Sequence, residues 1–162
     1  MSVLEIGCGV GRRCLEIATS GADRVVGVDP TENPVVMGRR DEVLSKASVE
    51  LCNRIVFFRG TIETLPPETF DVVVSEDTLE HVLNVSDLFE QAKNRLKPGG
   101  KFYLGFGPPY HAPTGDHGWL RAVLPGRRFF AWPWGHLVFE RLAFQRLSKL
   151  YGKLVTNTHD WP

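Results

Sequence analysis

A chain of 162 residues, 43% of them hydrophobic, is long enough to bury the core of one domain, and its length does not require a second. Lys and Arg together number 19, as do Asp and Glu, so no net charge would draw the whole molecule to nucleic acid or to an anionic membrane. The sequence has neither a signal segment nor an apolar run approaching the roughly 20 residues that span a bilayer, so we expect a cytoplasmic protein without a transmembrane segment.

The first part of the chain predicts a strand, a helix and a second strand. Residues 3–6 and 24–29 are short apolar runs, rich in β-branched residues and bounded by turn formers, which is typical of buried strands. Between them, residues 12–20 place apolar side chains on one helical face and end before Gly21, the residue type that commonly follows a helix. The segment therefore predicts one βαβ unit.

The middle of the chain continues this alternation. Pro34 favours the first turn of a helix, which we expect to continue as far as Leu51. Its expected apolar face comprises Val36, Val43, Leu44, Ala47 and Leu51. Residues 55–58 and 70–75 then predict the third and fourth strands.

A further helix and strand complete the pattern. Asn84 can cap a helix whose apolar residues recur at helical spacing as far as Leu96, and residues 98–100, Pro-Gly-Gly, are expected to stop it before a strand over 101–105. Short apolar strands separated by amphipathic helices imply an α/β fold with a mainly parallel sheet covered on both faces.

The chain changes character after Phe106. Residues 107–119 are rich in Pro, Gly and His, which predicts a loop, and residues 136–151 return to helical periodicity. We therefore expect residues 1–106 to form the core, and residues 107–162 to add a substrate loop and a C-terminal helical cap to the same domain. The sequence begins directly before a strand and ends without a closing element, so we expect a fragment that is truncated at one or both ends.

A glycine-rich loop joins the first predicted strand to the first helix. Residues 5–11 read Glu-Ile-Gly-Cys-Gly-Val-Gly, and glycines at such a junction permit tight turns and let a ligand approach the backbone closely. Asp29 ends the second strand about 20 residues further on, the spacing at which a carboxylate can accept hydrogen bonds from ribose hydroxyls. The loop alone is weak evidence, but with Asp29 it indicates a site for a nucleoside-containing cofactor.

The glycine spacing distinguishes two classes of cofactor. A dinucleotide fingerprint requires glycine at positions 7, 9 and 12, whereas residue 12 is Arg and the third glycine is Gly11. The arrangement Glu-x-Gly-x-Gly-x-Gly instead resembles the first motif of class I S-adenosylmethionine-dependent methyltransferases. Residues 60–66, 70–82 and 96–101 resemble the later motifs of the small-molecule, methyltransferase type 11-like branch, in the same order. The resemblance covers about residues 3–106.

The resemblance implies a Rossmann-like three-layer αβα sandwich with strand order 3-2-1-4-5, in which residues 1–106 bind S-adenosylmethionine. Asp29 would hold the ribose hydroxyls, Thr61 stands where many relatives have an Asp that binds the adenine amino group, and Glu76 would lie near the amino acid portion. The cofactor-binding residues implied by the family are Glu5, Gly7, Cys8, Gly9, Gly11, Asp29, Pro30, Thr61, Ile62, Ser75 and Glu76.

Several of these residues also have structural interpretations. Asp29 could cap the next helix, Glu5 could be a buried carboxylate that supports the loop, and Thr61 with Glu63 could belong to an ordinary surface loop. For Glu5 we expect both roles to coincide.

The expected chemistry needs no conspicuous catalytic dyad. Methyl transfer from a sulfonium releases a neutral thioether, so alignment of the reactants and exclusion of water can supply much of the acceleration. We assign no catalytic residue, and the candidates by residue type are His81, His111, Asp116 and His117. The cysteines, Cys8, Cys14 and Cys52, lack metal-ligand spacing, so we predict no metal site.

The sequence therefore predicts an S-adenosylmethionine-dependent methyltransferase acting on a small-molecule or lipid-like acceptor. Two alternatives remain open: a noncatalytic or truncated cofactor-binding domain, and a nicotinamide-dependent oxidoreductase. The basic, Trp-containing segment after Phe106 leaves peripheral membrane contact open, while the neutral overall charge disfavours nucleic acid. The sequence does not predict the identity of the acceptor or the oligomeric state.

Overall fold

A computed structural model describes residues 1–31 and 33–107 of the chain. Residues Met1–Phe106 form one compact unit. The loop and helix expected after Phe106, with the candidate side chains of His111, Asp116 and His117, lie outside the described residues.

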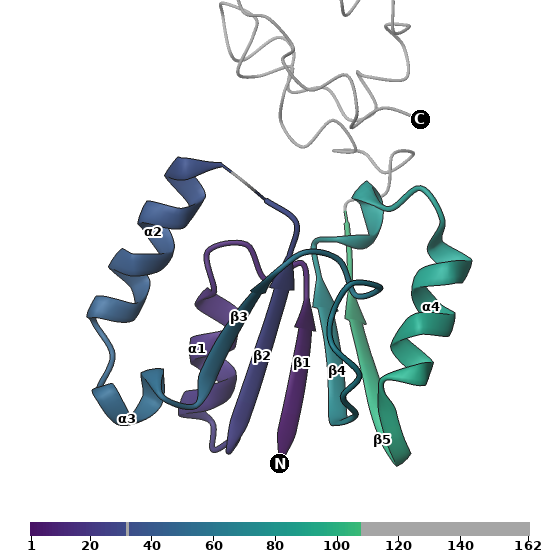
Figure 1. The fold of residues 1–162 in the computed structure, drawn as a ribbon, viewed down its shortest axis with the longest axis horizontal. Coiled ribbons are helices and arrows are strands. Elements are labelled where there is room, and N and C mark those ends of the chain that lie inside the picture. Colours follow the sequence, from purple (N-terminus) through teal and green to yellow (C-terminus); the bar gives the residue numbers. More distant parts are fainter. Residues whose placement is uncertain (32, 108–162) are drawn as a thin grey trace, which may run out of the picture. The chain divides into compact units, whose positions relative to one another are not determined.

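Five parallel strands form the sheet, in the spatial order β3-β2-β1-β4-β5. The strands are β1 (Ser2–Ile6), β2 (Arg24–Asp29), β3 (Ile55–Arg59), β4 (Phe70–Glu76) and β5 (Leu96–Gly105). All five arrows in Figure 1 point toward the same end of the sheet. The predicted strand order is confirmed, and it places the topological switch point between β1 and β4, where ligands of open α/β sheets bind.

Helices cover both faces of this sheet (Figure 1). They are α1 (Arg12–Thr19), α2 (Pro34–Ser45), α3 (Val49–Cys52), the 3₁₀ turn η1 (Leu79–His81) and α4 (Val85–Asn94). Alternating residues of β1 face opposite layers, since Val3 belongs to the core cluster of α1 and Leu4 to that of α4. The predicted Rossmann-like three-layer αβα sandwich is therefore confirmed.

The single helix expected over residues 34–51 is two helices. Pro34 occupies the first turn of α2 as predicted, and the Asn33 side chain caps it by accepting from the Val35 N–H at 2.9 Å. Ser48 caps α3 in the same way, so the chain leaves the helical conformation between residues 45 and 49. The residues of the expected apolar face are all half-buried, but the only buried residue of α2 is Arg40.

The Pro-Gly-Gly segment does not lie between a helix and a strand, as expected, but within β5. Helix α4 already ends at Asn94, and β5 pairs with β4 first at Leu96 and next at Lys101. The register therefore shifts between these pairs, and Gly99 in this segment has φ +78°. The glycine permits an irregularity inside the strand, which sequence patterns cannot distinguish from a turn.

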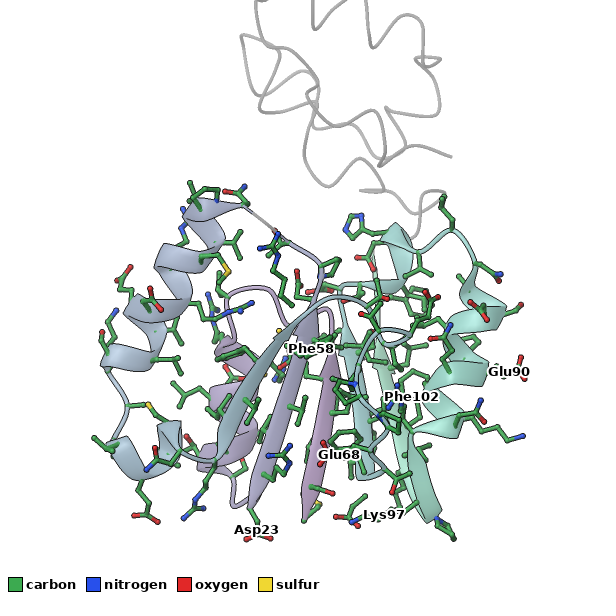
Figure 2. All side chains as sticks on the ribbon, viewed as in Figure 1. Asp23, Phe58, Glu68, Glu90, Lys97 and Phe102 are labelled. Atoms are coloured by element: carbon green, nitrogen blue, oxygen red, sulfur yellow. The ribbon has the colours of Figure 1, made fainter. Side chains whose placement is uncertain are left out.

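The end of the sheet opposite the glycine loop is closed by a polar network. Asp71 accepts from the Ser2 N–H at 2.6 Å and from the Lys97 ammonium at 2.9 Å. These bonds hold the pKa of the Asp71 carboxyl well below its usual range. Figure 2 shows Lys97 at this end, with Glu68 and Asp23 on neighbouring segments. Among the helices described, none is long and apolar enough to cross a membrane.

Candidate cofactor site

The glycine loop and Asp29 meet at the carboxyl ends of β1 and β2. The Gly9 N–H donates to Asp29 Oδ2 at 2.8 Å, and the Thr31 N–H donates to Asp29 Oδ1 at 2.8 Å. The structure thus brings together the two features that the sequence paired. An ionised carboxylate has about four acceptor positions, so two of them remain for a ligand hydroxyl.

Two glycines of the loop are required by neighbouring side chains. Gly7 has φ +76° and packs against Thr78, and Gly11 has φ +78° and packs against the ring of Phe57. A Cβ atom at either position would overlap its neighbour. The Gly7 N–H also donates to the Val28 carbonyl at 2.8 Å, so the loop lies directly against β2.

Gly9 differs from these two glycines because its side-chain direction is open. It has φ +46°, yet a Cβ atom built on it would meet no atom of the described chain within 4 Å. Packing among the described residues therefore does not require a glycine here, whereas the positive φ favours one. The open space above Gly9, next to the Asp29 carboxylate, is available to a ligand.

Buried sulfur and carboxyl groups support the loop from below. Glu5 is only 4% exposed, and the Cys14 thiol donates to its Oε2 at 2.8 Å. Burial raises the pKa of Glu5 to about 7, against the lowering effect of the Cys14 hydrogen bond. The hydrogen bond with Cys8 and burial hold the pKa of the Cys14 thiol far above its usual range, so this thiol remains protonated. Gly27 makes room for both sulfur atoms, because a Cβ there would overlap them.

The carboxyl end of β4 forms the side of the site next to the loop. Ser75 is fully buried opposite Ile6, and within the described part of the chain its Oγ has no hydrogen-bond partner. Glu76, by contrast, is exposed and forms an ion pair with Arg13 of α1. Thr78 Oγ1 donates to the Ile6 carbonyl at 3.3 Å and so ties the turn after β4 to β1.

The loop after β3 starts beside Asp29. The Gly60 N–H donates to the Asp29 carbonyl at 3.1 Å, and the exposed Thr61 follows it. The Ile62 side chain is 4% exposed and belongs to the hydrophobic core, and its contact with the cofactor stays a prediction. Arg95 fixes this loop by donating to three of its carbonyls: Ile62 at 3.0 Å, Leu65 at 2.6 Å and Pro66 at 2.6 Å.

Two predicted residues lie at the margin of this arrangement. Pro30 is exposed directly after β2, and its contact with adenine stays a prediction. His81 is exposed at the end of η1, and no catalytic role is assigned to it. Within residues 1–31 and 33–107, no group of three His, Cys, Asp or Glu side chains is placed to hold a metal ion.

Sequence patterns missed the side chains that hold the loops. Arg40, on α2, is 7% exposed and donates to the Gly9 carbonyl, through Nη2 at 2.5 Å and Nε at 3.2 Å. Phe57, Thr78 and Arg95 likewise act on backbone that is distant in sequence. Gly27 was a signal of close packing inside a strand, here by the Cys8 and Cys14 side chains, but it did not point to these residues.

The chain is similar to known methyltransferases. Residues 4–104 match the family model described as "Methyltransferase domain". A ubiquinone biosynthesis O-methyltransferase of Bradyrhizobium diazoefficiens is 29% identical over 142 residues, covering 77% of this chain and 53% of that protein. A tRNA U34 carboxymethyltransferase of Alteromonas mediterranea is 33% identical over 104 residues, covering 64% of this chain and 31% of that protein. The chain therefore spans about half of the first relative's length and about a third of the second's.

A solved structure has the same arrangement. The crystal structure of an S-adenosylmethionine dependent methyltransferase from Mesorhizobium loti aligns with a TM-score of 0.56 at 28% identity. The alignment covers 70% of this chain and 50% of that one.

Proposed function

The chain belongs to the methyltransferase domain family, and from that premise we propose that it binds S-adenosylmethionine and transfers its methyl group to a small-molecule or lipid-like acceptor. The cofactor would lie at the carboxyl ends of β1 and β2. The chain spans only part of the length of the relatives that it matches, so its methyltransferase activity is a proposal.

One observation carries the proposal: the Gly9 N–H holds the Asp29 carboxylate beside the glycine loop, where a ribose would bind. The Asp29 carboxylate is fixed by the Gly9 and Thr31 N–H groups, and the Cβ direction of Gly9 beside it is open. The fixed carboxylate needs little reorganisation to accept ribose hydroxyls, which strengthens binding. The open side of Gly9 lets a ligand approach the backbone closely next to this carboxylate.

The remaining residues fit the other parts of this cofactor. Glu76 and Arg13, at the end of β4 and the start of α1, present both charges that could match an amino acid zwitterion. The Ser75 Oγ, which has no hydrogen-bond partner among the described residues, lies at the same end of the sheet. When bound, S-adenosylmethionine supplies a methyl group on a positively charged sulfur. The chain's residues would then need only to orient the cofactor and exclude water.

We further propose that the acceptor is a small, lipid-like molecule methylated on oxygen. The relative from ubiquinone biosynthesis covers 77% of this chain, more than residues 1–106 alone can supply, so its similarity continues into the segment after the core. The match to the tRNA-modifying relative covers 64%. The longer match includes residues beyond those of the methyltransferase domain, so we take it as the better guide to the acceptor class. A cytoplasmic location, any membrane contact and the residues that meet the acceptor stay predictions.

Calorimetric titration of the folded chain with S-adenosylmethionine, S-adenosylhomocysteine and NAD tests the cofactor. We expect saturable binding of the two sulfur nucleosides and none of NAD. Binding of NAD alone would instead support the oxidoreductase, and a folded chain that binds none of the three would contradict the proposed site.

Methyl transfer is then measured with labelled S-adenosylmethionine and two acceptor sets, hydroxylated ubiquinone precursors and tRNA. Label in the lipid extract is the expected result. Label in tRNA would overturn the proposed acceptor class, and cofactor binding without transfer to either set would favour the noncatalytic alternative.

A further inference from the structure

Arg40 is an unusual residue in the described part of the chain because it is a nearly buried cation. Its side chain is 7% exposed, and within residues 1–31 and 33–107 it takes part in no ion pair. Burying an arginine without a carboxylate partner is costly, so its position needs compensating contacts. The contacts of Arg40 are made to Cys8 and Gly9 of the glycine loop and to the ring of Phe57.

The contacts of Arg40 converge on Gly9. Nη2 and Nε both donate to the Gly9 carbonyl, and Nη2 lies 3.8 Å from the Cys8 sulfur. The guanidinium carbon lies 4.3 Å from the centre of the Phe57 ring, a cation–π distance. The same ring packs against Gly11. Arg40 and Phe57 therefore support the loop at two of its three glycines.

Gly9 is consequently held from two sides. Its N–H donates to the Asp29 carboxylate at 2.8 Å, and its carbonyl accepts from the Arg40 guanidinium. The anion and the cation thus fix two successive peptide groups. Because the N–H and C=O of a trans peptide point in opposite directions, the grip on the Gly9 carbonyl also directs the Val10 N–H away from Arg40.

We propose that Arg40 is a positioning residue for the cofactor: by holding the Gly9 carbonyl, it keeps the glycine loop in the conformation that receives the ribose beside Asp29. The inference rests on the proposed function for its ligand, but the positioning of the loop can be measured without any ligand. Arg40, on α2, binds the carbonyl of Gly9, whereas Asp29 binds the N–H of the same residue. Arg40 can therefore act on the loop without touching the cofactor.

The test compares three variants of the chain. Arg40→Met keeps much of the side-chain length and removes the donors, Arg40→Lys keeps the charge but not the two-pronged hydrogen bond, and Arg39→Met changes an exposed arginine on the same helix. We measure amide hydrogen exchange of Gly9 and Gly11 without ligand, the dissociation constant for S-adenosylhomocysteine, and the melting temperature.

We expect faster exchange in Arg40→Met at Gly9 and Gly11, whose N–H groups donate to Asp29 and to the Cys8 carbonyl, and about tenfold weaker binding, as for the loss of a hydrogen bond to a charged group. Arg40→Lys should fall between it and the wild type, and Arg39→Met should match the wild type. A merely structural role would lower the melting temperature of Arg40→Met while leaving loop exchange and affinity of the folded protein unchanged, and that result overturns the proposal.

The two proposals can fail separately. If the wild type does not bind S-adenosylhomocysteine but loop exchange still rises in Arg40→Met, then the proposed function fails and the loop-positioning role stands. If Arg40→Met does not fold, Arg40→Lys carries the comparison, and wild-type exchange and affinity in that variant count against the inference.

Discussion

Replacing Glu5 with Gln should remove a pH dependence of stability that originates beneath the glycine loop. Glu5 is 4% exposed, and its carboxyl accepts from the Cys14 thiol at 2.8 Å. Gln has nearly the same shape and keeps an acceptor for that thiol, but it cannot ionise. The substitution therefore isolates the titration of one buried group.

The sign of the effect follows from the direction of the pKa shift. Burial raises the pKa of Glu5 from 4.5 to about 7, so between these pH values the folded state holds a proton that the unfolded state has released. The stabilisation is fully present below pH 4.5 and is lost as the pH rises through 7. A shift of this size corresponds to about 3 kcal/mol of unfolding free energy at most. Asp71, whose pKa is lowered, acts in the opposite direction and at lower pH.

Urea unfolding followed by circular dichroism, at pH values from 4.5 to 8, measures this contribution. We expect the stability of Glu5→Gln relative to the wild type to increase by about 3 kcal/mol across this range. Glu16→Gln is the control, because Glu16 is an exposed carboxylate on the neighbouring helix α1. Parallel curves for Glu5→Gln and the wild type would show that burial does not perturb Glu5, and the reasoning would be refuted.

Two further predictions concern the proposed ribose site. Asp29→Asn should weaken S-adenosylhomocysteine binding about 10- to 150-fold, because hydrogen bonds to a charged acceptor contribute about 1.5 to 3 kcal/mol each. Asp41→Asn, at an exposed position, is the control. If calorimetry gives Asp29→Asn the same affinity as the wild type, Asp29 does not belong to the site. Gly9→Ala and Gly21→Ala both place a methyl group at a positive φ, in space that no described atom occupies within 4 Å, so each should cost about 1 kcal/mol of stability. Only Gly9→Ala should also weaken binding, by about tenfold or more, since its methyl group would enter the ligand space. Equal affinities of these two variants would mean that no ligand approaches Gly9.

The sequence predicted the sheet well because its strands are short apolar runs with clear boundaries. Residues 24–29 and 70–75, for example, match β2 and β4 to within one residue at each end. The prediction failed where a local signal had two structural meanings. Pro-Gly-Gly at residues 98–100 ends many helices, but here it lies in a strand whose pairing with β4 tolerates a shift in register.

The sequence predicted only those residues of the candidate site that stand at fixed positions after a strand. The glycine loop and Asp29 stand at fixed positions after their strands, and the structure joins them by one hydrogen bond. Arg40 carried no such signal, because a cation on a helix is usually solvent-exposed and its role depends on Phe57, on β3. Arg95 carried no signal either, because its three carbonyl partners lie about 30 residues earlier in the chain.

Unfavourable features gather at the carboxyl ends of the strands and are scarce at the opposite end. The loop region contains positive φ angles, the buried cation of Arg40, the buried carboxyl of Glu5 and the Ser75 hydroxyl, which has no partner among the residues described. The amino ends are closed by Asp71 and Lys97, an ordinary partly exposed ion pair. Stability alone would favour apolar residues in place of the buried charges. Their concentration at the switch point of the sheet is what a preorganised binding loop requires, because such strain persists where a function depends on it.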